Sequence, residues 1–251
     1  MKQILFFSLA LFSSYAFGQT QSNSFISKSG NETGVTVSTN GNATSTALFI
    51  KQDWGIRNKK FNIGLGARLT SSFGNNKLEY TTAPARLTTG QTGPAVLFAN
   101  QITKNIDTLT VQSTQINTLN LFASFRYDFL EKWGAEFNID LAGFSFGSKT
   151  SSDLTYGENS NNKHKSSAKP SNLNLLLIGD NDRGSINSEF MATYKVKPNL
   201  RLKAGMVYLF NEYKLDNPVS YTNSLATNVN AETYRAKFVM FGIGVNYVFN
   251  K

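Results

Sequence analysis

Few side chains of this 251-residue chain could act as a general base or as a nucleophile. The chain has no cysteine and a single histidine, His164. His164 lies between Lys163 and Lys165, in an Asn-, Ser- and Lys-rich stretch over residues 159–169, with no carboxylate close in sequence to orient it. A catalytic base has to be held in position against the group it deprotonates. We therefore expect a solvated histidine in a mobile loop tip and predict that the chain is not an enzyme.

One acidic segment is similar to the start of a calcium-binding loop. Asp180, Asn181 and Asp182 precede Gly184. The later ligand positions and the bidentate glutamate of such a loop are missing, and without cysteine the chain has no thiolate ligand for a metal. We expect a turn or a β-bulge here, and no metal or cofactor.

The largest set of side chains that could interact with one another is charged. Five are acids and five are bases, and each occupies a polar position in an alternating segment: Asp53, Arg68, Arg126, Asp128, Glu136, Asp140, Glu189, Lys195, Arg201 and Lys203. Whether these charges meet depends on the elements that carry them.

Those elements alternate apolar and polar residues with a period of two, which indicates β-strands. In the last of them, Val239, Phe241 and Ile243 share one face, while Gly242 and Gly244 share the other. Seven segments show the pattern clearly, at 48–56, 61–70, 119–129, 133–141, 186–196, 200–211 and 235–250. A weaker eighth candidate is 22–28, with 31–42 as its loop.

The connections between these segments fall into two groups. Those at 57–60, 130–132 and 197–199 are short, whereas those at 74–115, 147–183 and 214–234 are long and polar. Short turns at one rim and long loops at the other are typical of bacterial outer-membrane barrels. We predict an all-β fold, an antiparallel up-and-down transmembrane β-barrel of about eight strands, with short periplasmic turns and long extracellular loops. Ten strands would follow if parts of the long loops enter the membrane.

The long loops contain further alternation, which predicts hairpins that continue beyond the membrane. We expect 78–82 to pair with 107–111, and 172–177 to pair with 151–156. Within the first loop, the apolar run at 94–98 is expected to fold into the barrel mouth or to form a contact patch.

The N-terminus has the order of a secretory signal, with Lys2, an apolar run over 4–12 and small residues up to Gly18. We predict cleavage after Gly18, a signal peptide over 1–18 and a single barrel domain over 19–251. The formal net charge is +9, but the basic residues are dispersed and the chain is expected to leave the cytoplasm. Nucleic acid is therefore not an expected partner.

The lumen of an eight-stranded barrel is about wide enough for side chains to fill it. The ten charged residues would point into that lumen, and buried charges are tolerated when they are paired. We predict a salt-bridge network that plugs the barrel. Glycines at 64, 66, 205, 242 and 244 would make room for the long side chains or permit strand curvature.

Gly244, Tyr247 and Phe249 resemble the C-terminal signal that the barrel-assembly machinery reads, although Gly242 and the two residues after Phe249 depart from it. Aromatic residues near the short turns, such as Trp54, are typical of an interfacial girdle. From about residue 22 to the end, the chain resembles the small OmpA/OmpX-type outer-membrane barrels. The segments 137–147 and 174–182 are similar to those of uncharacterised barrels of Gram-negative bacteria, a resemblance that implies the fold and the outer-membrane location but no activity.

The expected function is structural or surface interaction through the long loops. The expected partners are outer-membrane lipid, lipopolysaccharide, the barrel-assembly machinery and an extracellular ligand that the sequence does not identify. Lys163, Lys165 and Lys169 could pair with lipid phosphates. The alternatives are a narrow solute channel and an outer-membrane enzyme that modifies lipid or cleaves protein, with His164 as the residue to probe. A soluble lipocalin-like barrel or a sandwich is the structural rival.

Overall fold

The structure, a computed structural model, describes residues 26–56, 60–91, 99–155, 163–177, 182–222 and 228–249. Within these segments one antiparallel sheet has 13 strands. None of the described helices is long and apolar enough to cross a membrane. The predicted signal peptide, the apolar run at 94–98, Asp180 and Asn181 lie outside the described residues, and the domain division after residue 18 stays a prediction.

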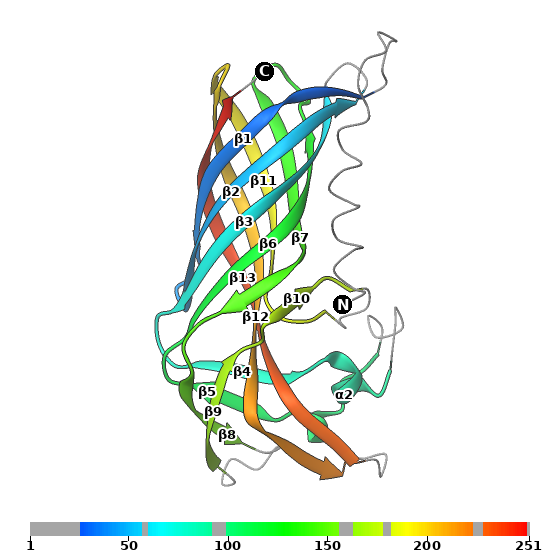
Figure 1. The fold of residues 1–251 in the computed structure, drawn as a ribbon, viewed down its shortest axis with the longest axis vertical. Helices are drawn as coiled ribbons and strands as arrows, with labels where there is room; N and C mark the ends of the chain where they lie inside the picture. Colours follow the sequence, from blue (N-terminus) through cyan, green and yellow to red (C-terminus); the bar gives the residue numbers. More distant parts are fainter. Residues whose placement is uncertain are drawn as a thin grey trace, which may run out of the picture.

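A closed circuit of strand pairs forms the body of the molecule (Figure 1). Each strand pairs with the next, and the last pairs again with the first. In order, the strands are β1 (Ile26–Thr39), β2 (Ala43–Ile56), β3 (Phe61–Gly74), β6 (Gln115–Tyr127), β7 (Trp133–Phe146), β11 (Ile186–Lys197), β12 (Leu200–Thr222) and β13 (Asn228–Phe249). We call this circuit the main ring.

A second, smaller circuit of strand pairs shares two strands with the first. It runs from β12 through β9 (Lys163–Pro170), β8 (Thr150–Thr155), β5 (Thr108–Val111) and β4 (Leu78–Ala83) to β13, which pairs with β12. We call it the cap ring. It lies at the end of the main ring opposite the short turns, where the long strands β12 and β13 carry the sheet onward (Figure 1).

Three short elements complete the fold. The helix α2 (Ala85–Thr89) and the 3-10 helix η3 (Thr103–Asn105) follow β4. The strand β10 (Leu173–Leu175) pairs with β7 beyond the point where β11 leaves it. A backbone bridge between Leu175 and Arg183 joins β10 to the segment before β11.

The expected count of about eight strands is wrong for the sheet, which has 13 in the described residues. The additional strands come from the long connections, which themselves pair into the cap ring. The prediction that 78–82 pairs with 107–111 is confirmed, since Leu78 lies opposite Val111 and Thr81 opposite Thr108. The predicted pairing of 172–177 with 151–156 is wrong, because β8 pairs with β5 and β9 while β10 pairs with β7.

The first strand is also longer than predicted. β1 continues to Thr39, so the expected loop at 31–42 is reduced to a tight turn. Gly41 has a φ of 88°, a left-handed conformation that favours glycine, and the Asn40 Oδ1 accepts hydrogen bonds from the N–H groups of Asn42 and Ala43. β1 was hard to recognise because its inward face is almost entirely polar, with Glu32, Thr36 and Ser38 buried there.

The cap ring encloses an apolar core. Leu109, Val111, Leu154, Tyr213 and Leu215 are all buried in one cluster, and the rings of Tyr80 and Tyr213 pack edge to face with centroids 5.1 Å apart. The cluster continues into the adjoining end of the main ring, where it includes Ile116, Met191, Val207 and Leu209. The cap ring is therefore an ordered barrel that shares one continuous apolar core with the adjoining end of the main ring.

Candidate functional site

The interior of the main ring is a network of buried charges. The ten charged residues predicted for the lumen all lie in it, and each forms an ion pair there. Two further charged residues, Glu32 and Lys51, belong to the same network. With these two it has six carboxylates and six bases, so the described network is neutral overall.

Arg126 is central to the half of the network near the short turns. Its Nη1 lies 3.0 Å from the Glu32 Oε2 and 2.8 Å from the Asp53 Oδ2. Glu32 also accepts a hydrogen bond from Arg201 at 2.7 Å. Lys51, fully buried, donates to the Glu136 Oε2 at 2.9 Å. These residues come from β1, β2, β6, β7 and β12, so the network ties together strands that are far apart in the sequence.

A second half of the network lies nearer the cap ring. Arg68 contacts Asp140 at 2.5 Å and Glu189 at 3.3 Å, and Lys203 contacts Glu189 at 3.1 Å. The Asn138 amide connects the two halves, because it donates to Glu136 and to Glu189 at 2.9 Å each. The paired charges and amides therefore form one connected structure across the lumen.

The lumen also contains aromatic rings. The Arg68 guanidinium lies 4.9 Å from the centre of the Phe122 ring, and the Lys203 ammonium lies 4.7 Å from that of Phe49. A cation that lies above the face of an aromatic ring is attracted to the ring electrons. Sequence reasoning missed Glu32, Lys51 and these two rings. The signal for Lys51 was present, since it shares its face of the strand with Asp53, whereas Phe49 is a bulky apolar residue on a polar face.

Glycines in the lumen leave space for the charged side chains. A Cβ on Gly244 would meet the Val35 carbonyl oxygen first and would also lie 2.8 Å from the Lys203 Cε. At Gly64 an added Cβ would clash with the Asp53 carboxylate. Gly205 differs, because its added Cβ would meet the backbone of Phe190 and Met191 rather than a charged side chain.

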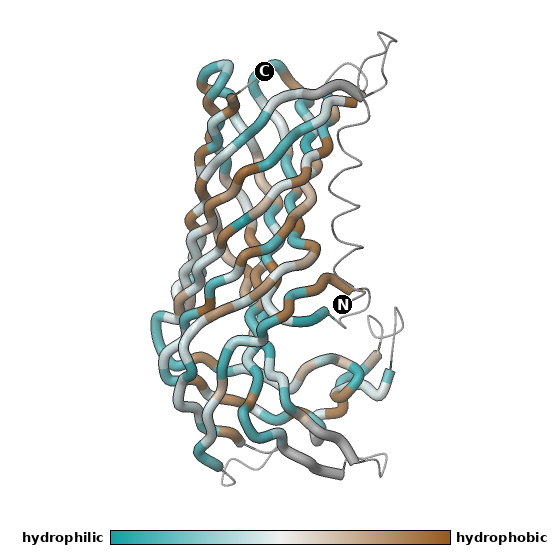
Figure 2. Tube along the Cα trace, in the orientation of Figure 1, coloured by the Kyte–Doolittle hydropathy of each residue, from teal (hydrophilic) through white to brown (hydrophobic). Residues whose placement is uncertain are grey.

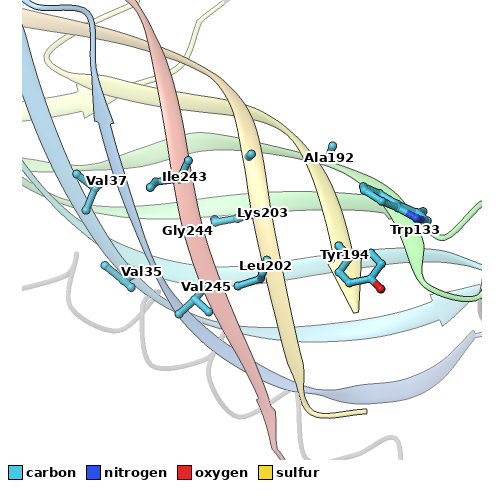
Figure 3. A pocket seen from close by; sticks show the side chains of 11 residues that line it. Val35, Val37, Trp133, Ala192, Tyr194, Leu202, Lys203, Ile243, Gly244 and Val245 are labelled. Atoms are coloured by element: carbon cyan, nitrogen blue, oxygen red, sulfur yellow. The ribbon is translucent and has the colours of Figure 1, made fainter. Parts of the chain in front are cut away.

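The outer wall of the main ring is apolar, the reverse of a soluble protein. Phe241, Leu121 and Phe144 expose 63%, 62% and 64% of their surface, and brown apolar positions alternate along the strands in Figure 2. A groove of about 730 Å³ in this wall is lined by Val35, Leu202 and Val245 among others. Trp133 and Tyr194 lie together at one end of it (Figure 3). The wall therefore suits a hydrocarbon environment.

At the junction of the two rings a further buried pair appears. The Arg235 Nη2 contacts the Glu212 Oε2 at 2.8 Å and the guanidinium lies 4.9 Å from the Phe210 ring centre. Asn211 donates to the Ser72 hydroxyl at 2.9 Å. Beyond them, burial raises the pKa of the Tyr80 phenol above its ordinary value, so it stays neutral in the cap core. The interior thus passes from charged to apolar along its length.

The remaining residues singled out in the sequence lie apart from the lumen. His164 is exposed on β9, opposite Leu154 of β8, so the expectation of a loop tip at 159–169 is wrong from Lys163 onward. The strand was missed because its outward residues are polar and, of its described side chains, only Ala168 and Pro170 are buried. The Asp182 Oδ1 accepts a hydrogen bond from the Leu177 N–H at 2.7 Å. Within the described segments, no group of three or more His, Cys, Asp or Glu side chains is placed to hold a metal ion.

The three residues of the predicted assembly signal lie on β13, at the end near the short turns. Tyr247 is opposite Thr33 of β1 and faces outward, Gly244 faces the lumen, and Phe249 is opposite Asn31. Their role in assembly stays a prediction.

Together these features define a closed antiparallel β-barrel with an apolar exterior and a charged, filled interior. No protein-family model matches the chain, and no curated protein sequence matches it.

Among solved structures, the chain is similar to three proteins of the bacterial outer membrane or of transport. Neisserial surface protein A is 10% identical with a TM-score of 0.33, over 90% of this chain and 98% of that one. The outer membrane protease OmpT from Escherichia coli is 12% identical with a TM-score of 0.38, over 82% and 64%. The CymD monoaromatic hydrocarbon channel is 12% identical with a TM-score of 0.26, over 90% of each chain. At these scores, the inference of function has to come from the geometry of the chain itself.

Proposed function

We propose that the chain is an outer-membrane β-barrel whose main ring spans the membrane, sealed, and holds the cap ring outside the cell as a surface for interaction. The observation that supports this most strongly is that the two rings have opposite polarity on their inner and outer faces. The main ring exposes large apolar side chains and buries charges, while the cap ring buries apolar side chains and exposes charges such as Glu79, Lys165 and Asp216.

The reversal argues against a soluble lipocalin-like barrel or a sandwich. A soluble protein would expose apolar side chains singly rather than as a continuous belt around the molecule. In hydrocarbon the main ring satisfies its backbone groups because it is closed. The spanning parts of the two long strands are about 200–211 of β12 and 236–249 of β13, and the short turns would then face the periplasm.

The interior supports a seal rather than a channel. A solute entering from the short-turn end would meet the ion pairs of Arg126 and Arg68, and one entering from the other end would meet the cap core. Opening the first barrier requires separating buried charges, which is costly. We infer that the ring acts as an anchor, and we assign no catalytic role to His164.

The test combines location with conductance. The full-length chain is expressed, the outer membrane is isolated, and the extracted protein is run on a gel with and without boiling. We expect an outer-membrane band that shifts on boiling, protease cleavage of the cap ring on intact cells, and no single-channel conductance in planar bilayers. A water-soluble protein without a shift would contradict the membrane anchor, and stable conductance would support the channel instead. As a separate check on catalysis, His164→Ala should leave lipid-modifying and proteolytic activity at the level of the unmodified chain.

A further inference from the structure

A polar cleft of about 740 Å³ opens at the junction of the cap ring and the main ring. Its lining comes from α2, from β9 and its connection to β10, from β10 and the segment between it and β11, and from the parts of β12 and β13 that enter the cap ring. That volume lies within the range of small-molecule binding sites. The proposed function places this junction at the outer surface of the membrane. The charges and the apolar side chains of the cleft then determine which ligand fits it.

The three carboxylates that line the cleft already have partners. Glu232 pairs with Lys214 at 2.9 Å, and Glu212 pairs with Arg235 at 2.8 Å. The Asp182 carboxylate accepts a backbone hydrogen bond at 2.7 Å. Two of the three negative charges are therefore balanced by ion pairs, and four bases line the cleft against three carboxylates.

Two arginines in the same lining differ from these carboxylates in whether they form ion pairs. Arg86 on α2 and Arg183 beside β10 are both exposed, and neither forms an ion pair with another residue of the described part of the chain. Lys169 of β9 adds a third positive charge. Two guanidinium groups from different elements thus border one cleft with their hydrogen-bond donors available. Guanidinium groups match phosphate oxygens in bidentate geometry.

The cleft also adjoins the apolar wall of the main ring. Leu173 and Leu177 line it and expose 48% and 39% of their surface. Leu173 lies opposite Phe144, one of the most exposed residues of the wall. The cationic lining is therefore continuous with the surface that the proposed function places in hydrocarbon.

We propose that this cleft binds the phosphorylated headgroup of an outer-leaflet glycolipid. Arg86 and Arg183 bind the phosphate, and the acyl chains lie along Leu173 and Leu177 toward Phe144. This assignment rests on the proposed function, because it needs the junction to lie at the membrane surface. It differs from the sequence expectation, in which lysines 163, 165 and 169 met the lipid. Of these, Lys165 lies beyond the cleft on β9, opposite Asp153.

The experiment measures binding to the full mature chain in detergent micelles, by titration calorimetry or native mass spectrometry. The probes are diphosphoryl lipid A, the same lipid without its phosphates, and sodium phosphate. The test variant is R86Q/R183Q. The matched control is K77Q/K165Q, which removes two exposed positive charges at the same end of the barrel but outside the cleft.

We expect the test variant to bind diphosphoryl lipid A more weakly by about a factor of ten or more, as for the loss of charge-assisted hydrogen bonds, and the control to bind like the unmodified chain. Equal binding by the test variant, or equal binding of the dephosphorylated lipid, would overturn the proposal. Sodium phosphate binding as tightly as the lipid would overturn the assignment to a lipid headgroup. Each variant is first checked for the gel shift on boiling. A chain that shifts but lacks cleft binding contradicts this inference alone, whereas a soluble chain without a shift contradicts the proposed function.

Discussion

The main ring and the cap ring share β12 and β13 yet enclose opposite interiors. Along β13 the inward positions in and next to the cap ring are apolar, with Tyr234, Ala236 and Phe238 buried, whereas Asn246, near the short turns, is buried and donates a hydrogen bond to the Glu32 carboxylate. On the outward face the order reverses, since Lys237 is followed by exposed Val239. The period of two continues unbroken across this change.

The two rings show that alternation of apolar and polar residues specifies a strand, but not whether its outer face contacts water or lipid. A half-buried strand has the same pattern whether its apolar face meets a protein core or lipid. The two rings differ in the size and charge of the residues that face their interiors. Glu136 and Arg68 require partners inside a ring, whereas Leu109 and Leu154 require only exclusion from water.

The largest expected effect is on the main ring, from Glu136→Ala. Lys51 would lose its closest carboxylate and remain buried, and removing one partner of a buried pair costs about 3–5 kcal/mol. The free energy of unfolding in urea and micelles measures the loss, together with the temperature at which the gel shift occurs. Asp140→Ala should act similarly through Arg68. An unchanged gel shift for both variants would contradict a structural role of the network.

A double variant sharpens this prediction. Replacing Lys51 and Glu136 together by Met removes both charges, so the double variant should be more stable than the summed losses of Lys51→Met and Glu136→Met predict. Additive losses would show that the two side chains act independently. Leu121→Ala, on the lipid-facing side of β6, is the control with little expected effect.

In the cap ring, Leu109→Ala should leave a cavity and cost about 2–5 kcal/mol. Because Leu109 lies in the cap-ring part of the apolar cluster and not among the lumen charges, we expect faster amide hydrogen exchange in β4, β5 and β8, while the gel shift of the main ring is retained. Leu109→Met, which conserves volume, should cost less. Loss of the gel shift in Leu109→Ala would mean that the two rings unfold as one unit.

The sequence was sufficient to predict the strands of the main ring apart from most of β1, because large apolar residues alternate along them. The inward direction of charges such as Arg126 also followed from that alternation. The pairing of individual charges did not, since it depends on how the strands are staggered around the ring, and sequence spacing does not specify that stagger.

The cap ring could be predicted only in part. The segment 78–82 and its partner strand alternate visibly, whereas the described side chains of β9 are buried only at Ala168 and Pro170. Its pairing with β12 involves only Tyr213 to Leu215. Short strands with few apolar residues are stabilised by neighbours distant in sequence, so local alternation is a weak signal for them.

One substitution at two outward positions compares the rings directly. Leu121→Lys places a charge on the lipid-facing wall, and we expect a cost of about 2–4 kcal/mol if the site lies near the middle of the bilayer. Thr110→Lys, on the outward face of β5, lies between Glu79 and Asp153 on the neighbouring strands, so its effect should stay within about 0.5 kcal/mol. Unfolding of both variants in lipid vesicles measures the difference. Equal costs would show that the two outer faces meet the same solvent.

The smallest expected effect concerns Asp216 in the cap ring. Hydrogen bonds from Lys149 and from the Ser167 hydroxyl hold the pKa of this carboxyl below its ordinary value. Because the folded-state pKa of Asp216 is lowered, the contact stabilises the cap ring at a pH above the pKa of the unfolded chain. This stabilisation is lost as the pH falls through the folded-state pKa. We therefore expect the protection of amides near Ser167, measured against their intrinsic exchange rates, to fall only below about pH 4, weakly because the group is exposed and screened by salt. Asp216→Asn should remove that step while leaving the Glu136 network unchanged, and a persistent step of the same size would assign it to another carboxylate.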